Sequence, residues 1–306
     1  EGIDIAPFKA QNMSNNAGVT PSGREMGRAQ IVQAEASGLA PHVDMNPILL
    51  KPNTDTGSQV IKHGILVGNM EARAYFSGRM DALRPAVLES LHRLRERHDL
   101  IVVEGAGSCA EVNLRDRDLV NFPVAHHAQA PVILVADIHR GGVFAQIVGT
   151  LEVMPVQDRA RVAGMIINRF RGDPTLFKDG RAWLEERTQL PVLGVIPWTR
   201  EFRIESEDGL PPDAKVDAPP PTDRGRVQVA IIRLPHIANF TDFDALETHG
   251  AAVHYLAKPR DLSAYDLLIL PGTKNTRGDL SWMKRVGWSE FIDAHAVRGG
   301  TILGIC

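Results

Sequence analysis

Short apolar runs that alternate with helical stretches constrain the fold of this chain more than any other feature of its sequence. Four of these runs are rich in apolar and β-branched residues and carry no charge: residues 100–103, 132–136, 163–167 and 192–196. Such runs suit strands that are buried on both faces, as in a parallel sheet. Residues 84–98 instead place Val87, Leu91 and Leu94 on one helical stripe. Strand, helix and strand in repetition predict an α/β fold with a doubly wound, mostly parallel sheet.

The pattern breaks down over residues 205–224. This stretch holds five Pro and six acidic residues and almost nothing apolar, so it cannot bury enough surface to fold by itself. We expect an interdomain linker here. Apolar runs then restart and predict a second α/β domain: residues 227–232, 266–272 and 300–306. The predicted organisation is a first domain over 1–204, a linker over 205–224 and a second domain over 225–306.

The charge balance and the cysteine content exclude several classes of protein. Lys and Arg total 34 against 37 Asp and Glu, a formal net charge of -3, which provides no basic footprint for nucleic acid. No apolar run approaches the roughly 20 residues that span a bilayer, and no signal-peptide pattern opens the chain. Two cysteines cannot make a disulfide framework, so we expect a cytoplasmic protein. The chain begins at Glu1 and stops directly after an apolar run, as we expect of an internal piece of a longer protein.

An amide-rich segment, residues 6–16, is the first candidate for ligand binding. Its amides and hydroxyls suit a polar, anionic ligand, and Lys9 adds a point charge for phosphate or carboxylate. A surface loop with turn-forming Asn residues is the alternative. The candidate substrate-binding residues in this segment are Gln11, Asn12, Ser14 and Asn15.

Polar residues also follow the predicted strands, where open α/β sheets bind ligands. Glu104 ends the first run and precedes Gly105 and Gly107, so it suits Mg²⁺ while the glycines let phosphate approach the backbone. A capping acid before a tight turn is the alternative.

Two further strand ends carry polar residues. Asp137 and Arg140 follow the second run and precede a Gly-Gly pair that opens a helix, which suits an anionic intermediate. A surface Asp–Arg pair explains these two residues equally well. Asn168 follows the third run and would read a base edge or cap a turn.

Cys306 ends the last apolar run, where a nucleophile elbow would project its thiol. Such a nucleophile needs a base and an oxyanion hole, and the backbone of Leu270-Pro-Gly-Thr273 could supply the N–H groups of the latter. A buried structural cysteine is the alternative.

Taken together, these segments resemble the glutamine-hydrolysing cobyric acid synthases of cobalamin biosynthesis. The most distinctive strings are Gln11-Asn-Met-Ser-Asn-Asn16 and Asp44-Met-Asn-Pro47. Further strings extend the resemblance over nearly the whole chain: Gly27-Arg-Ala-Gln30, Val103-Glu-Gly-Ala-Gly-Ser108, Asn113-Leu-Arg-Asp-Arg-Asp118, Asn239-Phe-Thr-Asp-Phe243 and Leu270-Pro-Gly-Thr-Lys274.

The resemblance implies a ligase that forms C–N bonds with glutamine as the amido donor. A P-loop-type, dethiobiotin-synthetase-like domain would use Mg²⁺ and ATP to phosphorylate the b, d, e and g carboxylates of adenosylcobyrinic acid a,c-diamide. A flavodoxin-like glutamine amidotransferase domain would deliver ammonia to the acyl phosphates. The implied partner is this corrinoid, with neither nucleic acid nor membrane, and a homo-oligomer is left open.

The same resemblance assigns roles to individual residues. Glu25 and Glu104 occupy the two acidic Mg²⁺ positions, Lys9 the phosphate and substrate-carboxylate position, and Asn168 the adenine-reading position. Cys306 falls at the glutaminase nucleophile. Asp137 is expected in the catalytic site and Arg140 beside the substrate.

The chain also departs from the family. The Gly-rich P-loop expected just before this segment and the glutaminase residues after Cys306 are absent. We therefore expect this chain alone neither to bind ATP normally nor to complete a catalytic triad. His139 stands where the family usually carries Asp, and Cys109 replaces the usual Pro.

Two other functions compete with this interpretation. A cobyrinic acid a,c-diamide synthase is built from the same two modules. A P-loop switch ATPase, as in chromosome or septum-site partitioning, shares only the first, and Cys306 and the second α/β domain argue against it.

Overall fold

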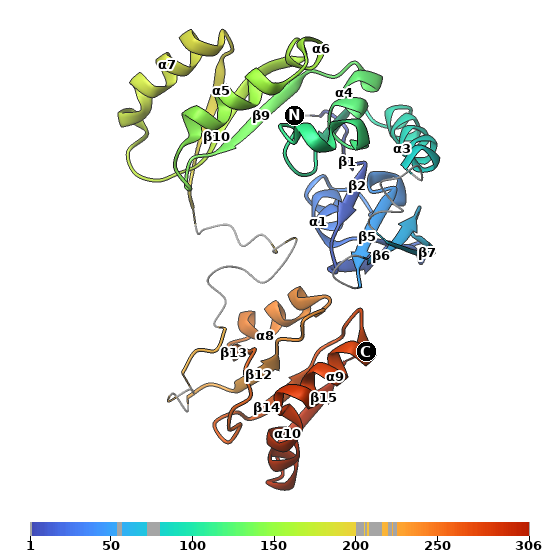
Figure 1. The fold of residues 1–306 in the computed structure, drawn as a ribbon, viewed down its shortest axis with the longest axis vertical. Coiled ribbons are helices and arrows are strands. Elements are labelled where there is room, and N and C mark those ends of the chain that lie inside the picture. The colour runs from blue at the N-terminus through green and yellow to red at the C-terminus, as the bar shows by residue number, and fades with distance from the viewer. Residues whose placement is uncertain are drawn as a thin grey trace.

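The computed structural model describes residues 2–53, 57–71, 80–199, 205, 207, 216–219, 222 and 225–305 (Figure 1). Its α/β class with parallel sheets confirms the fold class predicted from the sequence. The four apolar runs of the first region form the strands β8 (Leu100–Glu104), β9 (Val132–Asp137), β10 (Val162–Phe170) and β11 (Val192–Pro197).

These strands form two separate parallel ladders in the described part of the chain. One joins β1 (Ile5–Lys9) to β8, with Lys9 opposite Glu104 in the register. The other has the order β11-β10-β9. Among the described residues, no strand pairs with the second edge of β8 or with the second edge of β9. The sequence did not reveal these two unpaired edges.

Helices cover the two ladders and bury an apolar face against each. The predicted helix over 84–98 is confirmed as α3 (Met80–Arg95), in which Val87, Leu91 and Leu94 are buried. In the second ladder's core, Ile147 and Leu184 pack with Met165 of β10. The helices of this part are α4 (Phe122–Ala128), α5 (Val143–Val153), α6 (Val156–Arg159) and α7 (Lys178–Thr188), with the 3₁₀ turns Val112–Arg117 and Pro174–Phe177.

A small mixed sheet near the N-terminus was not expected. Its order is β2-β5-β6-β7, with antiparallel pairing between the last three strands. Residues His63 and Gly64 form the turn between β6 and β7. Both have positive φ (46° and 72°), as a two-residue type I′ hairpin turn requires. The elements are β2 (Gln11–Met13), β3 (Ala17–Val19), β4 (Glu25–Gly27), α1 (Arg28–Ala36), a 3₁₀ turn (Val43–Met45), β5 (Ile48–Pro52), β6 (Gly57–Lys62) and β7 (Ile65–Glu71).

The second region is a parallel sheet with the order β13-β12-β14-β15 (Figure 1). Its strands are β12 (Gln228–Ile232), β13 (Ala252–Leu256), β14 (Leu267–Leu270) and β15 (Thr301–Gly304). Two helices lie between β14 and β15, because Gly287 adopts a φ of 93° and ends the first of them. The helices are α8 (Asp244–Thr248), α9 (Thr276–Val286) and α10 (Trp288–Val297), with a 3₁₀ turn at Phe240–Phe243.

Most of the predicted linker lies outside the described residues. Among those that are described, Glu205 pairs with Arg28 and Glu207 with Lys9, and Val216 forms a bridge with Tyr255. The domain boundaries at 204 and 225 stay predictions. Within the described part of the chain, no helix has both the length and the apolar character that crossing a bilayer would require.

Candidate active site

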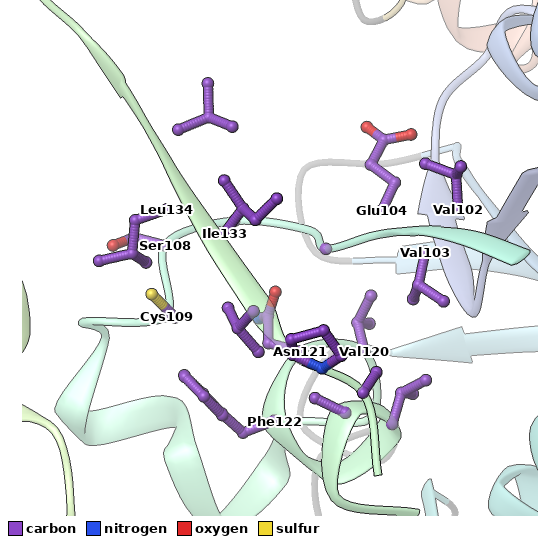
Figure 2. A pocket seen from close by; sticks show the side chains of 18 of the residues that line it. Val102, Val103, Glu104, Ser108, Cys109, Val120, Asn121, Phe122, Ile133 and Leu134 are labelled. Atoms are coloured by element: carbon purple, nitrogen blue, oxygen red, sulfur yellow. The ribbon is translucent and has the colours of Figure 1, made fainter. Parts of the chain in front are cut away.

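A cavity of about 1020 Å³ separates the β1–β8 ladder from β9 (Figure 2). Its walls are apolar side chains of the two strands that face it, with Val102 of β8 56% exposed and Val135 of β9 62% exposed. Valines in the middle of parallel strands are normally covered. The cavity is therefore an uncovered stretch of sheet core rather than an ordinary surface groove.

Glu104 lines the polar end of this cavity, and Lys9 is its ion-pair partner. They end neighbouring parallel strands, and Lys9 Nζ lies 2.9 Å from Glu104 Oε1. Gln33 Nε2 of α1 donates to Glu104 Oε2 at 2.8 Å. The Glu104 side chain keeps 38% of its surface exposed and is a labelled residue of the cavity wall in Figure 2, so it remains accessible to a ligand.

Lys9 has a second carboxylate partner that sequence reasoning missed. Glu207 Oε1 lies 2.8 Å from Lys9 Nζ, and its backbone carbonyl accepts a hydrogen bond from Ser14. Burial disfavours the charge on Lys9, but the hydrogen bonds to Glu207 and Glu104 outweigh it and raise the pKa of Lys9. Lys9 is thus a buried ammonium whose charged form is favoured by its two carboxylate partners. Nothing local to Glu207 signalled this role, because it lies in a stretch predicted to be a linker.

The turn that follows Glu104 depends on Asn121, which sequence reasoning also missed. The Asn121 side chain accepts a hydrogen bond from Ala106 N (3.1 Å) and donates one to Ala106 O (3.0 Å). A Cβ atom at Gly105 would lie only 2.2 Å from Asn121 Oδ1. A glycine at position 105 therefore lets the Asn121 side chain approach closely and fix the loop after Glu104. Both residues line the cavity, and Figure 2 labels Asn121.

Asp137 and Asn168 lie side by side at the ends of β9 and β10, as register partners. Asp137 pairs with Arg169 (3.1 Å), and its other oxygen accepts from His139 N. Arg169, which has a φ of 61°, was not singled out from the sequence. Arg140 is exposed, and Asn168 Oδ1 accepts from the backbone N–H of Arg169.

In the amide-rich segment, most of the polar groups bond to other parts of the protein. Asn12 Nδ2 donates to Gln30 Oε1 at 2.9 Å, and both residues are buried. Ser14 bonds to Glu207, and Gln11 also has a polar partner. Asn15 Oδ1 is buried without a hydrogen-bond partner in the described residues.

Three of the strings that carry the family resemblance, residues 11–16, 27–30 and 44–47, meet in one buried network. Asn46 donates to the carbonyls of Lys9 (3.1 Å) and Ile48 (3.0 Å), and it accepts from Gly27 N (3.2 Å). A Cβ at Gly27 would lie 2.5 Å from Gln30 Oε1 and 2.9 Å from Asn12 Nδ2. The network therefore fixes the end of β1, where Lys9 lies.

Glu25 pairs with Lys51 rather than with a group near Glu104. Burial lowers the pKa of Lys51 to about 8, Lys274 acts in the same direction, and Glu25 opposes both. No group of three or more His, Cys, Asp or Glu side chains suited to a metal occurs in the described residues. Mg²⁺ is commonly held by one or two carboxylates together with phosphate and water, and the side chains of Glu104 and Glu25 keep 38% and 33% of their surface exposed.

In the second region, a buried aspartate organises the loop after β14. Asp279 Oδ1 accepts a hydrogen bond from His236 Nδ1 at 2.8 Å, and Asp279 Oδ2 accepts one from the Thr273 hydroxyl. Ile305 N donates to Leu270 O at 2.9 Å, so the end of β15 lies beside this loop. Cys306, the predicted nucleophile, lies outside the described residues.

Comparison with known proteins agrees with this architecture. Residues 228–306 match the CobB/CobQ-like glutamine amidotransferase domain, and residues 70–206 match an AAA domain.

Curated relatives match this chain over its whole length. A cobyric acid synthase of Chlorobium phaeobacteroides is 60% identical over 306 residues, which is 100% of this chain and 62% of that protein. Cobyric acid synthases of Chlorobaculum tepidum and Sorangium cellulosum are 56% and 48% identical over 306 residues, all of this chain and 61% and 58% of their own length. The chain thus spans about 60% of the length of these relatives. Over its whole length the chain is similar to these cobyric acid synthases, with a region that matches an AAA domain followed by a region that matches the CobB/CobQ-like glutamine amidotransferase domain.

Proposed function

We propose that this chain provides the carboxylate-activating region and part of the ammonia-producing region of a cobyric acid synthase. The observation that carries the proposal is the Lys9–Glu104 pair at the carboxyl ends of two parallel strands, in a chain whose relatives bear that name. Its substrates would be ATP, glutamine and adenosylcobyrinic acid a,c-diamide.

The chemistry follows from the weakness of a carboxylate as an electrophile. Transfer of the γ-phosphoryl group of ATP to a peripheral carboxylate forms an acyl phosphate and ADP. Ammonia then attacks the carbonyl carbon, phosphate leaves, and an amide remains. Four such cycles would convert the b, d, e and g carboxylates, with one glutamine hydrolysed to glutamate for each amide.

The residues of the first region would divide this work. Lys9, charged and buried, would hold a phosphate or the substrate carboxylate. Glu104, with Glu25 as the second acidic position, would hold Mg²⁺, which neutralises charge on the phosphates. Asn168 would contact the adenine and Asp137 the reacting groups. Arg140 and the amide-rich segment would bind the corrinoid.

The cavity between β8 and β9 has the position of a missing strand of a continuous sheet. Its two walls are strand edges with exposed valines, and a parallel strand inserted there would give the continuous order β1-β8-X-β9-β10-β11. We propose that a further strand of the whole protein fills it. The carboxyl end of that strand would then lie between Lys9–Glu104 and Asp137–Asn168, which would unite the two groups in one site.

Mass spectrometry on the full-length protein tests the function. With adenosylcobyrinic acid a,c-diamide, Mg-ATP and glutamine, we expect four successive losses of about one mass unit as each acid OH becomes NH₂. Unchanged corrinoid together with intact glutaminase activity would instead favour a cobyrinic acid a,c-diamide synthase. Absence of glutaminase activity would favour a switch ATPase, although the match to a glutamine amidotransferase domain argues against it.

A Cys306→Ser variant of the full-length protein tests the division of labour. Only ammonia production needs the thiol, so amidation with glutamine should be lost while amidation with added ammonia is retained. Loss of both activities would contradict separate sites.

A further inference from the structure

The second region contacts the first through two side chains of the 239–243 segment. Asn239 Oδ1 accepts a hydrogen bond from Ala17 N at 3.0 Å, and the Thr241 hydroxyl donates to Asn16 Oδ1 at 3.0 Å. Asn16 is 2% exposed and Thr241 8% exposed. A hydrogen bond between two buried side chains from distant parts of the chain fixes their relative position, because breaking it leaves both groups unsatisfied.

On the side of the second region, this contact is anchored in the core. Asn239 has a φ of 51°, a conformation that Asn adopts more readily than most residues. Phe240 and Phe243 on either side of Thr241 are buried, and Tyr255 of β13 donates to Phe240 O at 3.3 Å. The 239–243 segment is therefore fixed relative to the sheet of the second region, and Asn239 and Thr241 are fixed with it.

On the side of the first region, the contact joins the elements that hold the candidate site. Ala17 belongs to β3, which pairs with β4. Asn16 N donates to Ser14 Oγ, and Asn16 O accepts from Arg28 N at 3.0 Å. The same stretch of chain leads back through β2 to Lys9, so the contact and the ion pair with Glu104 share one short, ordered segment.

A second contact comes from the loop after β14. Asn275 Nδ2 donates to Asn53 O at 3.2 Å, and Lys274 lies close enough to Lys51 to lower its pKa. Both contacting segments follow the carboxyl ends of parallel strands, β12 and β14, and Ile305 bonds beside β14 at the same edge. The carboxyl ends of the strands of the second region therefore face the first region. Open α/β sheets bind their ligands at these ends.

We propose that Asn239 and Thr241, which are hydrogen-bonded to Ala17 and Asn16, are positioning residues. They hold the carboxyl ends of the strands of the second region, where ammonia would be produced, against the carboxylate-activating region. This inference rests on the proposed function. Ammonia that escapes into neutral water is protonated and loses the lone pair with which it attacks the acyl phosphate. A fixed contact between the two regions lets it reach the acyl phosphate before this happens.

The test uses Asn239→Gly and Thr241→Val in the full-length protein. Glycine retains the left-handed backbone and removes the acceptor, and valine retains the shape of threonine and removes the donor. Thr248→Val is the matched control, because the Thr248 hydroxyl bonds only within α8, to Asp244 O, at an exposed position. In both test variants the glutamine hydrolysed per amide formed should rise several-fold, while amidation with added ammonia stays close to that of the parent protein.

Amide hydrogen exchange gives a readout that does not depend on activity. The Ala17 amide should be protected in the parent protein and exchange faster in Asn239→Gly, but not in Thr248→Val. Unchanged protection of Ala17 would overturn the contact itself. Lost protection with unchanged stoichiometry, or with equal falls in the glutamine- and ammonia-dependent rates, would overturn its coupling role. If the parent protein amidates no corrinoid acid, the proposed function fails, and the exchange result still decides the contact.

Discussion

Lys9 and Glu104 are register partners on two parallel strands, and their side chains form a 2.9 Å ion pair where both strands end. The two residues differ in their burial and in their number of charged partners. Lys9 is 5% exposed and has a second carboxylate partner in Glu207, whereas Glu104 faces the cavity. Loss of Glu104 would therefore leave the lysine paired, and this allows a test that separates chemistry from folding.

Glu104→Gln in the full-length protein should lower amidation with glutamine and amidation with ammonia alike. Loss of a carboxylate that supports phosphoryl transfer removes several kcal/mol of charge stabilisation, on the order of a hundredfold in rate or more. Thermal unfolding should change little, because Glu207 still pairs with Lys9. Glu111→Gln, at an exposed position beyond the same turn, is the control. Full activity of Glu104→Gln would remove Glu104 from the metal site.

Gly105→Ala should destabilise the protein by about 1–3 kcal/mol, because the new Cβ displaces Asn121 from its two hydrogen bonds with Ala106. Denaturant unfolding measures this change.

A second glycine substitution provides the contrast. Gly149→Ala in α5 adds a Cβ that meets nothing within 4 Å and should stabilise by roughly 0.5–1 kcal/mol. Equal effects of the two substitutions would show that the Asn121 contact does not constrain position 105.

Asn46→Ala should lower the free energy of unfolding by about 2–4 kcal/mol. The substitution leaves the backbone groups of Gly27, Lys9 and Ile48 without their partner in a buried site. Asn69→Ala, at an exposed side chain that bonds to Asn53, should change it by less than about 0.5 kcal/mol. A small effect at Asn46 would mean that water or a neighbouring side chain replaces its bonds.

The stability contributed by Lys51 should rise with pH. Its folded-state pKa is about 8 against an ordinary value of 10.5, so between these values the folded protein has released a proton that the unfolded chain still binds. Stability increases with pH wherever the unfolded state binds more protons.

Comparison of the parent protein with Lys51→Met, by denaturant unfolding from pH 7 to 10.5, measures this effect. The difference between them should shift in favour of the parent as the pH rises through this range. Lys62→Met on the neighbouring strand β6 controls for the loss of a lysine. A difference that is constant with pH would contradict the lowered pKa of Lys51.

Much of the secondary structure was predictable because it depends on local pattern. Short apolar runs predicted β8 to β11 and β12, β14 and β15, and one apolar stripe predicted α3. The strands β2 to β4 were missed because they have three residues each. The strands β5 to β7 were missed because they mix apolar residues with polar ones, such as Lys51, whose partners lie elsewhere in the chain. The strand β13 was missed as well, since it includes the buried polar residue His254.

The sequence by itself determined the class of fold and which residue types stand at the ends of strands, since both follow from periodicity and order along the chain. Only the tertiary structure decided their partners: Asp137 with Arg169, Lys9 with Glu207 and Glu25 with Lys51. It also decided the contact of Thr241 with Asn16, across 225 positions. An ion pair or hydrogen bond forms between whichever groups the folded backbone brings within a few ångströms, and local patterns carry no information about that proximity.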